Sequence, residues 1–263
     1  MTLKYILPNF YDNYLYNKTI MDKLITKRNI CGIQGTFPLS IYNGSYNNIY
    51  GEEICLYDKI ATVFSDYGLL SDMAILDYGN PFLEDTDYYD LYNRVILEEF
   101  AEKETHYFAV SQVKFIDFLI SKYPKINIIL HQNYTREHTS EEIQILIDKY
   151  PNIKGIIISS FNLCTKVKNV FKIYLLPIHG CEECVHYHKC LKHDNYATLE
   201  FSGKSEFAEC KWRKLIYPET IIERIHYVKD YCDYILFDTV IRANDIEEYA
   251  LIETVIEKAE EHS

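Results

Sequence analysis

The stretch INIILHQNYTREHTSEEIQILIDKYPNIKGIIISS, residues 126–160, decides the fold of this chain. It opens on an apolar run, Ile126–His131, and closes on a second one, Gly155–Ser159. Thr139 and Glu142 have the spacing of a helix capping box between the two runs. Four apolar residues then recur at the spacing of one helix face: Ile143, Leu146, Ile147 and Tyr150. A strand, a helix and a strand in this order predict a parallel βαβ unit.

The same alternation of strand and helix extends along the whole chain. The strand candidates are Tyr5–Phe10, Ile30–Gly35, Met73–Tyr78, Tyr107–Ser111, Ile126–His131, Gly155–Ser159, Lys172–Pro177 and Tyr234–Phe237. Eight units in 263 residues predict a single α/β domain over residues 1–263, a (β/α)8 barrel of the TIM type. An open, doubly wound sheet is the alternative. No Gly-x-Gly-x-x-Gly or P-loop sequence supports a nucleotide-binding version of it.

Composition narrows the classes of partner. The formal net charge is −12. An acidic chain attracts the negatively charged phosphate backbone of a nucleic acid only weakly, so free DNA is not expected as a partner. The sequence contains no run of 18 apolar residues, so no membrane span is expected. Its N-terminus does not resemble a signal peptide. We therefore expect a cytoplasmic protein. Its eight cysteines are then thiols or metal ligands rather than disulfides.

Four of these cysteines lie in one long insert, near residues 179–217, and predict a metal centre. Their spacing is C-x2-C-x5-C-x19-C, and they are Cys181, Cys184, Cys190 and Cys210. Thiolates at such spacings can hold zinc or an iron–sulfur cluster, and the residues alone favour neither. His186, His188 or His193 could replace one cysteine on zinc. Long loops of this kind in a compact domain are usually functional or disordered.

Four further segments form a recognisable set: Gln34–Pro38 with Asn43–Ser45, Asp77–Pro81, His179-Gly180 before a cysteine, and Leu236 through Arg242. These segments resemble the collagenase-like peptidase family, peptidase family U-32, and its short clostridial-type relatives. The resemblance implies a TIM barrel with a 4Fe-4S cluster on the four cysteines, so it favours iron over zinc. It also implies activities such as oxygen-independent hydroxylation of tRNA or of quinone precursors.

The chain departs from the family pattern at two places. The first family cysteine stands four residues past the histidine, whereas Cys181 and Cys184 stand two and five past His179. Ile241 replaces the glycine before Arg242. In some relatives the fourth ligand comes from further downstream, so Cys232 rivals Cys181 or Cys210 as a ligand.

Polar residues at the predicted strand ends form the candidate active site. His131, Asn133, His179 and Arg242 are the catalytic candidates within a ring that also includes Gln34, Asp77, Ser111 and Ser159. An arginine at this place could clamp a carboxylate.

Two functions follow from these residues. One is an iron–sulfur oxidoreductase, hydroxylase or maturase that acts on a small molecule, a peptide or tRNA. The other is a hydrolytic or non-catalytic barrel with structural zinc, which could bind a protein partner or a second copy of the chain.

Overall fold

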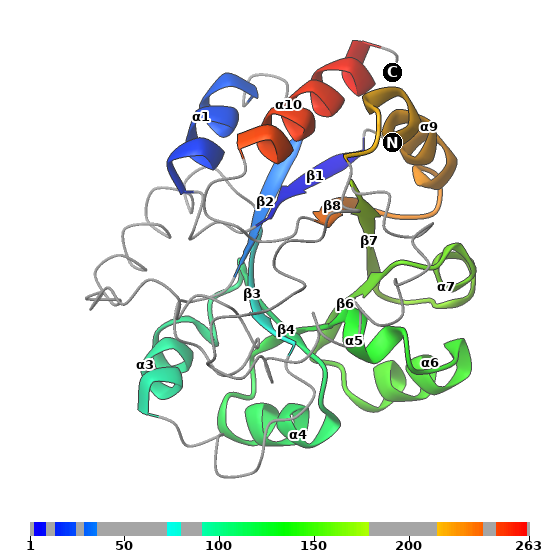
Figure 1. Ribbon diagram of the computed structural model, residues 1–263. Helices are drawn as coiled ribbons and strands as arrows, with labels where there is room; N and C mark the ends of the chain where they lie inside the picture. The colour runs from blue at the N-terminus through cyan, green and yellow to red at the C-terminus, as the bar shows by residue number, and fades with distance from the viewer. Residues whose placement is uncertain are drawn as a thin grey trace, which may run out of the picture.

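Eight parallel strands form a closed barrel (Figure 1). The computed structural model describes residues 3–8, 14–24, 29–35, 73–79, 91–178, 215–238 and 246–261. The strands follow one another in chain order, and β8 pairs with β1 to close the ring. They are β1 Lys4–Leu7, β2 Ile30–Gly35, β3 Met73–Tyr78, β4 His106–Val110, β5 Asn127–Leu130, β6 Ile153–Ile158, β7 Phe171–Pro177 and β8 Tyr234–Asp238. The predicted (β/α)8 barrel is confirmed, and the open sheet is excluded.

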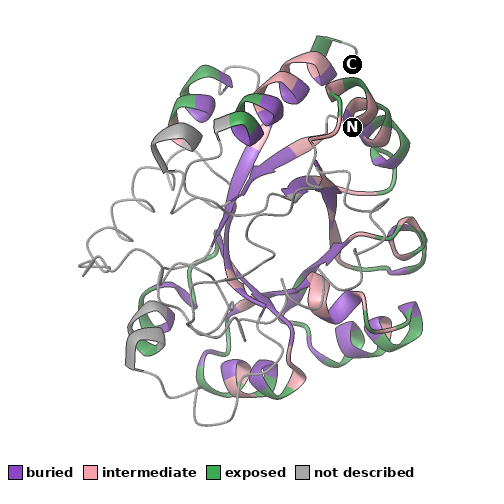
Figure 2. Cartoon of the chain, viewed as in Figure 1, coloured by how far each residue is buried: buried purple, intermediate pink, exposed green. Residues whose placement is uncertain are grey.

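Helices surround the barrel and bury their apolar faces against it (Figure 2). They are α1 Tyr14–Leu24, α3 Leu91–Phe100, α4 Val113–Lys122, α5 Gln132–Thr135, α6 Ser140–Lys149, α7 Phe161–Lys166, α9 Pro218–Val228 and α10 Ile246–Glu261. The predicted capping box is present at the start of α6. The hydroxyl of Thr139 accepts a hydrogen bond from the Glu142 N–H, and the Glu142 carboxylate accepts one from the Thr139 N–H.

Alternate residues of each strand point into the barrel, and this alternation positions the site. Ile75, Ala109, Ile129 and Ile157, on β3 to β6, share one buried cluster inside the ring. Their neighbours along each strand pack instead in the layer between the barrel and the helices. Side chains of a strand alternate with a period of two. The next inward positions are therefore Asp77, Ser111, His131 and Ser159, at the carboxyl ends of the strands.

An aromatic cluster fills the opposite, amino-terminal end of the barrel. The ring of Phe171 makes edge-to-face contacts with Tyr107 and Tyr234, at centroid distances of 5.6 and 5.5 Å. Gly155 leaves room for this ring, because a Cβ there would lie 2.1 Å from it. In barrels of this kind the carboxyl ends of the strands carry the active site.

The structure shortens two of the predicted strands. β1 ends at Leu7, and β5 ends at Leu130, so His131 begins the turn into α5 instead of extending the strand. The insert Pro38–Asp72 and most of the cysteine-rich insert lie outside the described residues. Within the described ranges, no helix has the length and apolar character that a membrane span requires.

Candidate functional site

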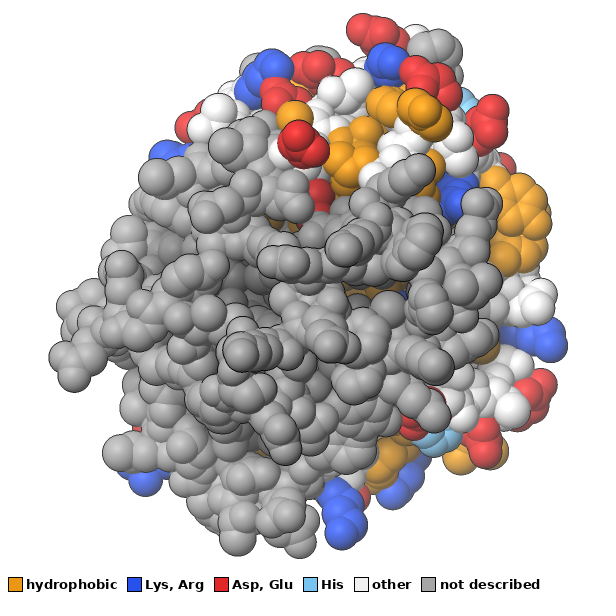
Figure 3. All heavy atoms as spheres, in the orientation of Figure 1, with side chains coloured by type: hydrophobic (Ala, Val, Ile, Leu, Met, Phe, Trp, Pro, Cys, Tyr) orange, Lys and Arg blue, Asp and Glu red, His pale blue; other side chains and the backbone are white. Residues whose placement is uncertain are grey.

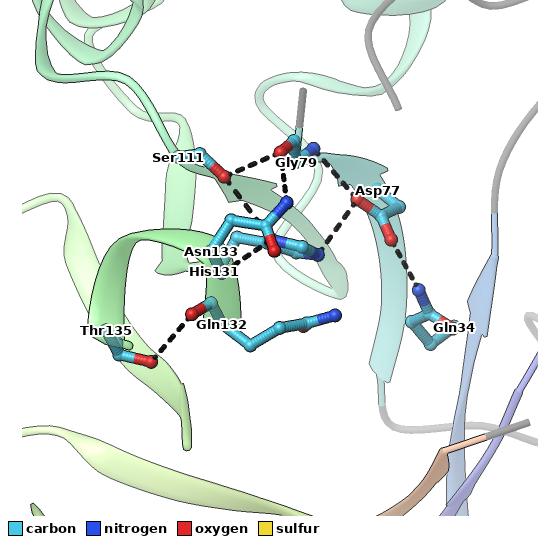
Figure 4. Close-up of polar contacts among 8 residues, drawn as sticks. All are labelled: Gln34, Asp77, Gly79, Ser111, His131, Gln132, Asn133 and Thr135. Carbon is cyan, nitrogen blue, oxygen red and sulfur yellow. Dashed lines mark hydrogen bonds and ion pairs between the residues drawn. The ribbon is translucent and has the colours of Figure 1, made fainter. Parts of the chain in front are cut away.

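A network of hydrogen bonds joins the carboxyl ends of β2, β3, β4 and β5 (Figure 4). It centres on Asp77 at the end of β3. One carboxylate oxygen, Oδ2, accepts a hydrogen bond of 2.9 Å from Gln34 Nε2 on β2. The other, Oδ1, accepts one of 2.8 Å from the backbone N–H of Gly79 and lies 3.4 Å from Nε2 of His131. Two hydrogen bonds and the contact with His131 therefore fix the orientation of this carboxylate.

The surrounding bonds assign the tautomer of His131. The Asn133 N–H can only donate, and it lies 3.2 Å from His131 Nδ1. Ser111 Oγ is 3.3 Å from the same nitrogen, but its single proton goes to the carbonyl oxygen of Gly79 at 2.8 Å. Nδ1 therefore accepts and carries no proton, and the proton of the neutral ring is on Nε2, facing Asp77.

The side chain of His131 is more deeply buried than that of Asp77. It is only 5% exposed, whereas that of Asp77 is 14% exposed. Both nitrogens of the ring are already engaged within the network. This arrangement suits a histidine that orients a carboxylate, and it makes Asp77 the group with the better access to a substrate. The catalytic role predicted for His131 itself stays a prediction.

Gly79 permits the close approach of these groups. Its carbonyl oxygen accepts hydrogen bonds of 2.8 Å from Ser111 Oγ and from Asn133 Nδ2. A Cβ on Gly79 would lie 2.4 to 2.6 Å from the imidazole ring of His131, far inside contact distance. Asn133 Oδ1 is buried and has no hydrogen-bond partner among the described residues. An acceptor in this state could receive a hydrogen bond from a ligand.

The one-turn helix α5 positions two of the predicted site residues. His131 is its N-cap, and Asn133 lies within it. Thr135 ties the helix to β6, because its hydroxyl donates to the carbonyl oxygen of Ile157 at 2.7 Å. In Figure 4 the side chain of Gln132 extends from this helix toward the side on which Gln34 lies. The structure thus brings together His131 and Asn133, whereas His179 and Arg242 lie outside the described residues.

The two ends of the cysteine-rich insert meet at the carboxyl end of β7. The chain leaves at Ile178, directly after β7, and the described residues resume at Leu215. The N–H of Ile216 donates to the carbonyl oxygen of Ile178 at 2.8 Å. The insert therefore starts and ends at the end of the barrel that carries the Asp77 network. Cys181, Cys184, Cys190 and Cys210 themselves lie outside the described residues.

Cys232, the rival metal ligand, lies at the end of the barrel opposite the start of the insert. It precedes β8, at the amino-terminal end of the barrel, while the insert begins at the carboxyl end of β7. Its thiol donates to the carbonyl oxygen of Val228 at 3.4 Å. Burial, assisted by Cys164 and Asp233 nearby, raises the pKa of the Cys232 thiol to about 12.

The described residues contain no group of three or more His, Cys, Asp or Glu side chains that could hold a metal ion. A metal centre in this protein would therefore depend on residues outside the described ranges. The spacing and chemistry of the four insert cysteines fit such a centre, because four thiolates are a complete ligand set for zinc or for an iron–sulfur cluster.

No protein-family model matches the chain, and no curated protein matches it. Among solved structures, the chain is similar to the apo form of 3-keto-D-glucoside 4-epimerase, YcjR, from E. coli. The two are 10% identical, with a TM-score of 0.43, over 94% of this chain and 86% of that one. A likeness this low implies no shared activity. The expected membership of peptidase family U-32 stays a resemblance.

Proposed function

We propose that this protein is an iron–sulfur enzyme of the oxidoreductase, hydroxylase or maturase type. Its active site would be the carboxyl end of the barrel. The observation that carries the proposal is the hydrogen bond between Ile216 and Ile178, because it anchors both ends of the cysteine-rich insert beside the strand ends. A cluster held there would stand at the same end of the barrel as Asp77.

Cys181, Cys184, Cys190 and Cys210 would hold the cluster, and a cytoplasmic, reducing environment would keep their thiols available. When bound, an iron–sulfur cluster supplies one-electron transfer or an iron atom open to substrate. The chain's own residues would bind and orient the substrate. His179 and Arg242, the other two catalytic candidates, would be among the residues that bind and orient the substrate.

Asp77 is the residue best placed to handle a proton at this site. Gln34, Gly79 and His131 hold its carboxylate in one orientation. An oriented carboxylate can accept a proton from a substrate hydroxyl or amine. Asn133 Oδ1, a buried acceptor, could bind a second donor of the same substrate. A small molecule, a peptide end or a nucleotide of tRNA could each present such groups.

The test is the metal and sulfide content of protein purified without oxygen. About four irons with matching sulfide, and a brown colour, are the expected result. Colourless protein with about one zinc would overturn the redox proposal and favour a structural zinc that pins the insert of a hydrolytic or non-catalytic barrel. Protein with neither metal, even after reconstitution with iron and sulfide, would overturn both.

A pair of variants shows whether the insert holds the metal. Cys184→Ala should lose most of the iron. Cys232→Ala should keep it, because Cys232 lies at the other end of the barrel. Loss of iron from Cys232→Ala alone would mean that the ligand set has been assigned to the wrong cysteines.

A further inference from the structure

A second polar site lies beside Arg136, at the end of α5 opposite His131. A pocket of about 410 Å³ opens between the corner that joins α5 to α6 and the start of α7. Its lining includes three basic side chains, one acidic side chain and three serines: Arg136, His138, Lys166, Glu141, Ser140, Ser159 and Ser160. The Asp77 network does not use any of these side chains.

The pocket borders the mouth of the barrel through Ser159. This residue follows Ile157 at the inward-facing position after β6, as His131 follows Ile129 after β5. Arg136, the C-cap of α5, donates from Nε to Ser159 Oγ at 3.3 Å. The rise along α5 from its N-cap His131 to Arg136 is about 7 Å, given 1.5 Å per residue. The two ends of α5 therefore belong to the two sites, His131 to the Asp77 network and Arg136 to the pocket.

The charges of the pocket favour an anion. Arg136 and Lys166 are positive; Arg136 donates to Ser159, and Lys166 lies close enough to Glu141 to act on its charge. Glu141 is the acidic member, and hydrogen bonds from its own backbone and from Ser140 lower the pKa of its carboxyl, so it stays charged. The net charge of these three is positive on a chain whose formal charge is −12. Figure 3 shows acidic and basic side chains interspersed along the described rim, so a net positive pocket is a local feature.

The donors of the pocket suit an oxygen-rich group. Arg136 uses Nε for Ser159, which leaves its two terminal amino groups able to bind two oxygens side by side. Ser160 is the N-cap of α7, yet its hydroxyl makes no capping hydrogen bond. The N-terminus of α6 adds little, because Thr139, Glu141 and Glu142 already occupy its first turn. The hydroxyl of Ser140 donates to the Glu141 carboxylate, so the site depends on Arg136, Lys166 and the hydroxyls of Ser159 and Ser160.

We propose that this pocket binds the phosphate or carboxylate group of the substrate. The anionic group is held by Arg136 and Lys166, and the rest of the molecule extends past α5 to Asp77. The binding of the anion stands on the pocket alone. Only the statement that its owner is the substrate rests on the proposed function.

The test is a titration of the full-length protein with inorganic phosphate and, separately, with acetate, followed by isothermal calorimetry at constant ionic strength. Saturable binding of one ion per chain at millimolar concentrations is the expected result. Tighter binding of phosphate assigns a phosphorylated ligand, and tighter binding of acetate assigns a carboxylate. No saturable binding of either ion would overturn the proposal.

Three variants locate the binding. Arg136→Gln should weaken it about ten-fold or more, because a charged hydrogen-bond donor is lost, while Arg136→Lys should weaken it less. Arg94→Gln is the matched control, since it removes the same charge from the exposed Arg94–Glu98 pair on α3. Equal weakening by Arg94→Gln and Arg136→Gln would mean diffuse charge attraction, and the pocket would be excluded. Circular dichroism verifies that each variant is folded.

The same protein samples separate this proposal from the proposed function. If phosphate or acetate binds at Arg136 in protein that contains no iron, the anion-binding pocket is supported and the proposed iron–sulfur function is overturned. If the protein contains iron but shows no saturable anion binding, the iron–sulfur proposal stands and the anion-binding pocket is overturned.

Discussion

The ring of His131 occupies the space that a side chain on Gly79 would need. An alanine Cβ at residue 79 would lie 2.4 Å from the imidazole Cε1. Glycine at this position therefore lets the end of β3 approach the residue that follows β5, and the contact between Asp77 and His131 depends on that approach.

We expect Gly79→Ala to lower the free energy of unfolding by about 2 kcal/mol, the usual cost of forcing an extra carbon into a packed site. Urea unfolding measures this change. The double variant Gly79→Ala with His131→Ala is the control, since it removes the ring that the new methyl group would meet. If Gly79→Ala costs as much in the His131→Ala background as in the natural protein, the clash with His131 is not its cause.

The tautomer of His131 provides a second prediction. Nitrogen NMR at neutral pH should show the proton on Nε2, because the Asn133 N–H donates to Nδ1. His138 is the internal comparison. Its Nδ1 lies 2.9 Å from the carbonyl oxygen of Tyr134, which can only accept, so His138 should carry its proton on Nδ1. The same tautomer at both histidines would contradict the network around Asp77.

The barrel could be predicted from the sequence because each of its strands has a local signal. A strand buried on both faces requires a continuous apolar run, and each helix between strands requires an apolar row at a spacing of three and four residues. Ile153–Ile158 and the row from Ile143 to Ile147 are examples. The sequence predicts the ends of β1 and β5 less well. Pro8 and His131 are residue types that can occur in a strand, so only the hydrogen bonds of the fold show that each strand has already ended.

The site was predicted only in part, because it depends on contacts between residues far apart in the chain. The polar residues at the strand ends could be read as a ring. No local signal tells that Asp77, 54 residues before His131 in the numbering, lies 3.4 Å from its Nε2. The inward alternation from Ile75 to Asp77 and from Ile129 to His131 was a usable signal. The helix α5 had none, since its four residues have no apolar period.

Cys164 and Cys232 should react slowly with iodoacetamide in the native protein. Burial raises the pKa of Cys164 to about 11 and that of Cys232 to about 12. The reactive thiolate at about pH 8 is then roughly a hundred-fold to a thousand-fold rarer than for an ordinary cysteine. Mass spectrometry of native and urea-unfolded samples gives the comparison. Rapid labelling of Cys232 in the native protein would contradict its placement, and labelling in urea confirms that the reagent is active.

Stability should fall in mild acid because of His106. This residue is buried at the start of β4, and its ring stacks on Phe100 with a centroid distance of 5.0 Å. Burial, with a smaller contribution from Lys103, lowers its pKa from 6.5 to about 4. Between these two values the unfolded chain binds a proton that the folded protein does not, so protonation favours unfolding.

The contribution of His106 is therefore complete above about pH 6.5 and is lost as the pH falls toward 4, by about 3 kcal/mol in total. Urea unfolding at about pH 7 and about pH 4.5 should show this loss in the natural protein and less of it in His106→Phe, which keeps an aromatic ring on Phe100. His226→Gln, which changes an exposed histidine of α9, is the control. If His106→Phe shows the same loss between the two pH values as the natural protein, another group titrates in this range, because a side chain that cannot bind a proton removes the His106 contribution entirely.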